Sequence, residues 1–274
     1  MSVIRIEHLT RDYGGGKGVF DLTMDVGEGE VFGFLGPNGA GKTTTIRHLM
    51  GFIKANSGSC TIAGHDCWRD AVQIQKNLGY IPGEICFFDE MRGDEYLTFI
   101  RKYRGLPNSG RMKELLERFE IDPKGRIKKM SKGMKQKIGI VAAFMHDPDI
   151  LILDEPTSGL DPLMQNRFIE LIQEEKGRGK TILMSSHMFE EVDRTCDRIG
   201  IIRDGRLVAL DSAQALRERH VRTYTVTLDQ EQTAAEFARE FGGRQDPEQP
   251  RRVTVTARQS LEEIFLHYYG GDRT

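Results

Sequence analysis

The stretch Gly36-Pro-Asn-Gly-Ala-Gly-Lys-Thr-Thr44 decides how the rest of the chain is interpreted. It matches the phosphate-binding pattern G-x-x-x-x-G-K-[ST], in which glycine-rich backbone N–H groups surround an anion. An apolar, strand-like run at 31–35 precedes it and a helix-like segment at 45–50 follows, so the positive end of a helix dipole also faces the loop. This strand, loop and helix predict a site for a nucleoside triphosphate.

The side chains of this loop suit a triphosphate and its metal ion. Lys42 can reach the β- and γ-phosphates, and the hydroxyl of Thr43 can bind Mg²⁺, a hard cation that prefers oxygen ligands. An ordinary glycine-rich turn would not need the full pattern. The expected binding residues are Gly36, Pro37, Asn38, Gly39, Ala40, Gly41, Lys42, Thr43 and Thr44.

A second apolar run, at 150–153, ends in the carboxylates Asp154 and Glu155. Such an uninterrupted run is typical of a buried parallel strand. Asp154 is placed to hold Mg²⁺ or its water shell, and Glu155 is placed to polarise an attacking water. His187 directly follows another strand-like run, and we expect it to contact the γ-phosphate because ligands of open α/β sheets bind beyond the strand ends.

Further residues concern anion and base binding. Ser131 and Gly133 stand at the start of a helical pattern, where a hydroxyl and unpaired N–H groups form a second anion site. Asp161 followed by Pro162 is typical of a helix start. Tyr13 lies beside flexible glycines, which suits stacking on adenine and suits an ordinary loop aromatic equally well.

The composition is that of a globular protein with one large α/β domain and a small appendage, since the chain has 274 residues, 38% hydrophobic and 29% charged. The net charge of −2 argues against a broad nucleic-acid surface. We find no apolar run of about 18 residues and no signal peptide. The four cysteines lack paired C-x-x-C spacing, which favours free thiols in a reducing cytosol.

The predicted fold class is α/β, with a P-loop NTPase core in residues 1–220. Alternating apolar residues at 3–9 and 20–26 predict an N-terminal antiparallel β layer. Helical periodicity from 93 to 120 predicts a helical subdomain at about 84–145. The pattern then changes to short strands and helices, which predicts a small α+β C-terminal accessory domain at 221–274, with Ser260 and Glu263 as a capping box.

Taken in order, these motifs resemble the nucleotide-binding subunit of ATP-binding cassette (ABC) transporters over residues 1 to about 220. The resemblance implies Walker A at 36–44, a signature at 130–134, Walker B at 150–154 and a D-loop at 158–161. It further implies that Glu155 is the catalytic glutamate, that His187 is the switch histidine and that Tyr13 stacks on adenine. The tail is similar to that of subunits that serve exporters with separate membrane subunits.

The resemblance also implies a function and partners. Two cassettes, as a homodimer or a mixed pair, would bind head to tail, with ATP held by Lys42 and Thr43 of one subunit and by Ser131 and Gly133 of the other. ATP hydrolysis with Mg²⁺ would power export of a substrate through transmembrane permease subunits. The chain would then be cytoplasmic and peripheral on the inner face of the cell membrane.

Three positions depart from the family pattern. In the Leu-Ser-Gly-Gly-Gln signature, Lys132 replaces the first glycine and Met134 replaces the glutamine, while Ser131 and Gly133, which would meet phosphate, remain. Gly83 stands where a glutamine is expected after a strand. Because glycine has no side chain to reach the nucleotide site, we expect Gly83→Gln to change transport-coupled ATPase activity more than basal activity.

Two alternatives stay open on the sequence alone. A non-transport ABC ATPase acting on nucleic acid or ribosomes would be supported by the basic run at 128–137, although no nucleic acid is expected from the overall charge. A regulatory nucleotide binder without hydrolysis is disfavoured by Glu155 and His187.

The resemblance also implies a groove that docks the membrane subunit. Candidates for its apolar floor are Phe87, Phe88 and Tyr96, which are equally compatible with core packing.

Overall fold

The computed structural model describes residues 2–88, 90–107, 110–219 and 221–258, and it divides into two compact units, Met1–Leu210 and Asp211–Thr274. The sequence placed this boundary near residue 220. The division falls earlier because the helix at 213–219 counts with the second unit. The expected capping box of Ser260 and Glu263 lies outside the described residues.

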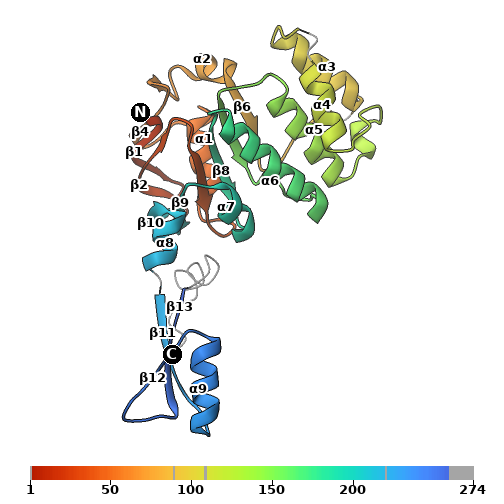
Figure 1. The fold of residues 1–274 in the computed structure, drawn as a ribbon. Coiled ribbons are helices and arrows are strands. Elements are labelled where there is room, and N and C mark those ends of the chain that lie inside the picture. The colour runs from red at the N-terminus through yellow and green to blue at the C-terminus, as the bar shows by residue number, and fades with distance from the viewer. Residues whose placement is uncertain (1, 89, 108–109, 220, 259–274) are drawn as a thin grey trace. The chain divides into compact units, whose positions relative to one another are not determined.

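Six strands form the main sheet of the first unit: β3 (Val31–Leu35), β6 (Leu78–Ile81), β7 (Ile150–Asp154), β8 (Thr181–Ser186), β9 (Arg198–Arg203) and β10 (Arg206–Ser212). Their order is β10-β9-β3-β8-β7-β6, and Figure 1 labels β6, β8, β9 and β10 among them. The strands from β9 to β6 pair in parallel. All residues of β3 and β8 are buried, as expected for parallel strands that are covered on both faces.

The register of this sheet brings separate chain segments together. Leu35 of β3 pairs with Ser186 of β8, and Asp154 of β7 pairs with Ser185 of β8. The three strands therefore end at the same edge of the sheet. The segments that follow them, which include the phosphate loop, leave the sheet side by side, at the edge where open α/β sheets bind ligands.

A second, antiparallel sheet contains β1 (Ser2–Asp12), β2 (Gly18–Gly27), β4 (Ser57–Ile62) and β5 (His65–Asp66), in the order β2-β1-β4-β5. The expected N-terminal antiparallel layer is therefore present, and β4 and β5 extend it. Helix α1 (Lys42–Leu49) contacts strands of both sheets. Ile46 and Leu49 of this helix share one core with Ile4 and Leu22 of the antiparallel sheet.

The middle of the chain is helical, as the sequence predicted for residues 93–120. It divides into α3 (Gly93–Tyr103) and α4 (Gly110–Arg118), which both contact α5 (Lys132–Phe144). The break has a local cause, because Gly105 adopts φ 65° and Pro107 follows it. A 3-10 turn, η1 (Ile127–Lys129), precedes α5.

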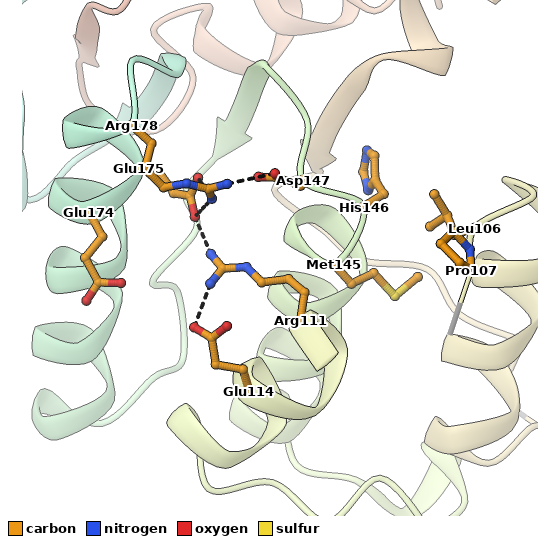
Figure 2. Close-up of a pocket in the computed structure, with 10 residues that line it drawn as sticks. All are labelled: Leu106, Pro107, Arg111, Glu114, Met145, His146, Asp147, Glu174, Glu175 and Arg178. Carbon is orange, nitrogen blue, oxygen red and sulfur yellow. Dashed lines mark hydrogen bonds and ion pairs between the residues drawn. The ribbon is translucent and has the colours of Figure 1, made fainter. Parts of the chain in front are cut away.

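Three helices complete the first unit: α2 (Ala71–Lys76), α6 (Pro162–Gly177) and α7 (Phe189–Thr195). Figure 2 shows the seam between α4 and α6, which surrounds a cavity of about 440 Å³. Arg111 of α4 donates hydrogen bonds to Glu114 and to the buried Glu175 of α6. Arg178 donates to Glu175 at 2.9 Å and to Asp147 at 2.7 Å. These charges pair with one another and join the helical segment to α6.

The second unit contains α8 (Ala213–Arg219), β11 (Val221–Thr227), α9 (Glu231–Glu240), β12 (Arg244–Gln245) and β13 (Arg252–Arg258). Its antiparallel sheet has the order β11-β13-β12, and α9 packs on β12 and β13. The short strand β12 lies within the largely polar segment 242–251. Across the described parts of both units, none of the helices combines the length and apolar character needed to span a bilayer.

Candidate nucleotide site

The phosphate loop runs from the end of β3 to the start of α1, and Gly41 is the N-cap of that helix. Its φ of 110° lies in the region that favours glycine. A Cβ atom built on Gly41 would lie 2.9 Å from Cγ1 of Val19, so a side chain has no room. Glycine therefore sets the course of the loop into α1, whose first N–H groups have no acceptor within the helix and can face an anion.

A cavity of about 440 Å³ opens beside the loop. Lys17 and Gly18 line it, and the sequence interpretation missed both. Lys17 had a readable signal, because it is a cation in the same glycine-rich loop as Tyr13. The predicted site residues that line the cavity are Tyr13, Asn38, Gly39, Gly41, Lys42, Thr43, Thr44 and Glu155.

The side chain of Lys42 is only 4% exposed, and its ammonium group lies inside the loop. Nζ donates to the carbonyl oxygens of Gly36 at 2.6 Å and Pro37 at 3.1 Å. It also lies 3.3 Å from Oε1 of Glu155. These oxygens compensate for the burial of the Lys42 charge. The side chain of Ala40, another residue of the loop, is also buried. The arrangement puts a cation and a carboxylate against each other in one cavity.

Glu155 is the first residue beyond β7, and its φ of 47° is left-handed, which is uncommon for a residue other than glycine. Its N–H donates to both the carbonyl oxygen and Oγ of Ser185 at 3.1 Å. Oε2 lies 3.4 Å from Nδ1 of His187. The carboxylate therefore lies between Lys42 and His187, held by a backbone conformation of the kind that clusters at active sites.

Asp154 is fully buried at the end of β7. Oδ1 accepts a hydrogen bond from Oγ of Ser185 at 2.5 Å, whereas Oδ2 has no hydrogen-bond partner within the described part of the chain. A buried carboxylate oxygen without a partner suits Mg²⁺, and the exposed hydroxyl of Thr43 lines the adjacent cavity. Sequence reasoning missed Ser185, because its contact with Asp154 depends on the pairing of β7 with β8.

Ser131, Gly133 and Asp161 are not among the described residues that line this cavity. Ser131 is the N-cap of α5, where its Oγ accepts a hydrogen bond from the backbone at 3.2 Å. Asp161 caps α6 in the same way at 3.0 Å, with Pro162 as the first helical residue. Lys132 connects the two segments, because its Nζ donates to Oγ of Ser158 at 2.8 Å.

Tyr13 is 51% exposed beside the cavity. The guanidinium of Arg11 lies 5.1 Å from the centre of its ring, at the distance of a cation–π contact. Tyr13 is therefore an exposed loop aromatic with a cation over its ring.

A family model described as ABC transporter matches residues 19–158, which contain the phosphate loop, Asp154 and Glu155. The chain belongs to the ABC transporter family. This ABC protein is an ATP-binding and ATP-hydrolysing transporter subunit, and its P-loop α/β fold was predicted from the sequence.

Curated relatives agree with this assignment. The linearmycin resistance ATP-binding protein LnrL of Bacillus subtilis (strain 168) is 36% identical over 222 residues, covering 79% of this chain and 71% of LnrL. The bacitracin transport ATP-binding protein BcrA of Bacillus licheniformis is 38% identical over 222 residues, covering 80% and 72%. The Nod factor export ATP-binding protein I of Paraburkholderia xenovorans (strain LB400) is 36% identical over 224 residues, covering 78% and 72%.

Solved structures show the same fold. A structure of the ATP-binding subunit of an ABC transporter has a TM-score of 0.75 and 27% identity, and the match covers 98% of this chain and 100% of that chain. A dimeric ATP-binding cassette in a post-hydrolysis state, bound to ADP and Pi, has a TM-score of 0.67 and 21% identity, with coverage of 76% and 98%.

Gly83, the departure noted in the sequence of this ABC protein, follows β6 and lies against Asp154. A Cβ atom built on Gly83 would lie 2.9 Å from Oδ2 and 3.2 Å from Cγ of Asp154. A contact below 3.0 Å forces a movement, and the other carboxylate oxygen is already held by Ser185. Glycine at this position therefore does more than omit a coupling side chain, because it leaves room for the carboxylate.

We expect Gly83→Ala to lower basal ATP hydrolysis about tenfold, because displacing an active-site group by about 1 Å can cost about 100-fold in rate. Gly83→Gln should lower it at least as much, which revises the expectation of a mainly transport-coupled effect. Steady-state phosphate release measures both rates. Gly177→Ala is the matched control, since a Cβ there meets nothing within 4 Å, and a wild-type rate for Gly83→Ala would contradict the steric argument.

Proposed function

We propose that two copies of this chain, or this chain and a close relative, pair head to tail and power export through separate membrane subunits. The observation that carries the proposal is the separation of the two predicted anion sites. Lys42 and Thr43 line the nucleotide cavity, whereas Ser131 and Gly133 do not. A second chain would bring its own Ser131 and Gly133 to the open side of this cavity and complete the contacts to the γ-phosphate.

In this proposal the chain's residues have separate tasks. Lys42 binds the β- and γ-phosphates, and Tyr13 stacks on the adenine. Glu155 accepts a proton from the attacking water, and His187, 3.4 Å from its carboxylate, orients it and contacts the γ-phosphate. Exclusion of water on pairing strengthens these charges around the phosphates.

Thr43 and Asp154 would hold Mg²⁺, which would neutralise charge on the phosphate oxygens. The unpartnered Oδ2 of Asp154 is the atom best suited to this task, directly or through a water ligand. The D-loop residue Asp161, which caps α6, would lie near the paired interface and contribute to the nucleotide site.

Support for export comes from the relatives, whose names describe antibiotic resistance or transport in two cases and Nod factor export in the third. We propose the same direction here, with the chain cytoplasmic and held at the inner face of the cell membrane by its permease partners. The concentration dependence of phosphate release tests the pairing on which this proposal rests. Specific activity should rise with protein concentration, whereas constant activity from a particle of monomer mass would contradict it.

The membrane subunit would dock on an aromatic surface formed by α3 and the segment before it. Of the three predicted residues, Phe88 is 58% exposed, whereas Phe87 and Tyr96 are half-buried and their ring centres lie 4.9 Å apart. Phe88 instead contacts Phe99 at 5.9 Å, and Phe99 stacks on Tyr103 at 6.2 Å. Exposed aromatic residues of this kind mark protein interfaces.

Phe88→Ser should reduce ATPase stimulation by the co-expressed membrane subunits about tenfold and leave the basal rate unchanged, because a buried aromatic anchor at an interface contributes about 2 kcal/mol or more. Reconstituted vesicles measure stimulated and basal rates on one preparation. Val72→Ser is the control, an exposed apolar residue on α2. Full stimulation of the Phe88 variant would rule out this docking surface.

A further inference from the structure

Glu191 is a buried acid that the proposed chemistry does not use. It lies on α7 and is 3% exposed. Oγ of Ser186 donates to its Oε2 at 2.7 Å, and Thr157 lines the same small pocket as this carboxyl group and interacts with it. Oε1 has no hydrogen-bond partner in the part of the chain that the structure describes.

The two hydroxyl groups belong to the two segments that carry the reactive side chains. Thr157 is the second residue after Glu155, in the turn that Ser158 N–H closes on the carbonyl of Glu155 at 3.1 Å. Ser186 directly precedes His187, and its Oγ accepts a hydrogen bond at 2.9 Å from the N–H of Met188, the residue that follows His187. One carboxyl group therefore lies against both turns.

Such a residue is costly to bury. The pKa of Glu191 is raised to about 7, chiefly because burial removes water from the carboxyl group. The interactions with Ser186 and Thr157 lower this pKa, and the nearby charge of Glu155 raises it. An apolar side chain at this position would avoid the cost of a buried oxygen without a partner. Buried acids of this kind cluster at functional sites, and the residues it holds indicate which function this one serves.

We propose that Glu191 is a positioning residue that holds Glu155 and His187 in register by bridging Thr157 and Ser186. The inference rests on the proposed roles of that pair. When the bridge is lost, the two turns can shift separately, and the 3.4 Å approach between the carboxylate and the imidazole is no longer fixed. The chemical step should slow, while the phosphate loop, which holds the nucleotide, keeps its contacts.

The test compares the turnover number with ATP affinity in purified protein. Glu191→Ala should lower the turnover number about tenfold and change ATP affinity less than twofold. Glu191→Gln, which keeps an acceptor for Ser186, should recover most of the loss. Glu190→Gln is the matched control, because Glu190 is exposed on the same helix and pairs with Arg194 at 3.5 Å. Turnover within twofold of wild type for Glu191→Ala, or an equal loss of affinity, would overturn the proposal.

A second arm separates positioning from loss of fold. Thr157→Val removes one end of the bridge with little change in the shape of the side chain. It should lower the turnover number about threefold to tenfold. This variant tests the proposal even if Glu191→Ala does not fold. In the double variant, the losses of turnover number caused by Glu191→Ala and by His187→Ala should not multiply, because both changes disturb the same group. Multiplied effects, or a wild-type rate for Thr157→Val, count against the bridge. If Glu155→Gln and His187→Ala are themselves active, the proposed catalytic roles fail instead.

Discussion

Replacing Glu155 with glutamine is expected to slow ATP hydrolysis by about 100-fold or more, because a positioned general base contributes about 10²–10⁴-fold to rate. Glutamine has nearly the same shape but cannot accept the proton of the attacking water. ATP binding should persist and can strengthen, since the substitution removes the carboxylate that lies 3.3 Å from Nζ of Lys42. Single-turnover phosphate release and equilibrium ATP binding measure the two effects separately.

The matched control for Glu155→Gln is Glu84→Gln, which changes an exposed glutamate shortly after the neighbouring strand β6. It should hydrolyse ATP at the wild-type rate. Near-normal hydrolysis by Glu155→Gln would remove this residue from the role of base, and loss of ATP binding would show that its main task is to hold the loop.

Replacing Lys42 with methionine should strongly weaken nucleotide binding, whereas Glu155→Gln should leave it intact. The ammonium group is held inside the loop by Gly36 and Pro37, where it can turn to the phosphates. Hydrogen bonds to charged groups contribute about 1.5–3 kcal/mol each, so we expect ATP affinity to fall about 100-fold or more. Titration with a fluorescent ATP analogue measures the loss.

Lys113→Met is the control for Lys42→Met, because Lys113 is exposed on α4 and pairs with Glu117 there at 3.5 Å. Thermal unfolding should be similar for both variants without nucleotide. ATP should raise the melting temperature of the control and not that of Lys42→Met. An equal upward shift in both would show that Lys42 does not bind the phosphates.

The features that the sequence predicted are local ones. The phosphate loop is a continuous pattern between a strand and a helix, and the cap of α6 by Asp161 with Pro162 needs only neighbouring residues. The apolar runs of β7 and β8 identify buried strands, and their ends identify Glu155 and His187. Propensity and spacing carry this information without knowledge of the fold.

The features that the sequence did not predict depend on contacts between distant segments. Ser185 meets Asp154 only through the register of β8 with β7. The close approach of Gly83 to Asp154 likewise needs the end of β6 beside β7, and Glu191 gains its role only where two turns meet.

The measurement that tests the account most directly is sedimentation velocity of the Glu155→Gln variant with Mg²⁺ and either ATP or ADP. Blocked hydrolysis should trap the closed pair, so the account predicts a dimer with ATP and a monomer with ADP. A monomer in both nucleotides, with ATP binding confirmed on the same sample, would contradict the claim that Ser131 and Gly133 of one chain complete the site of another.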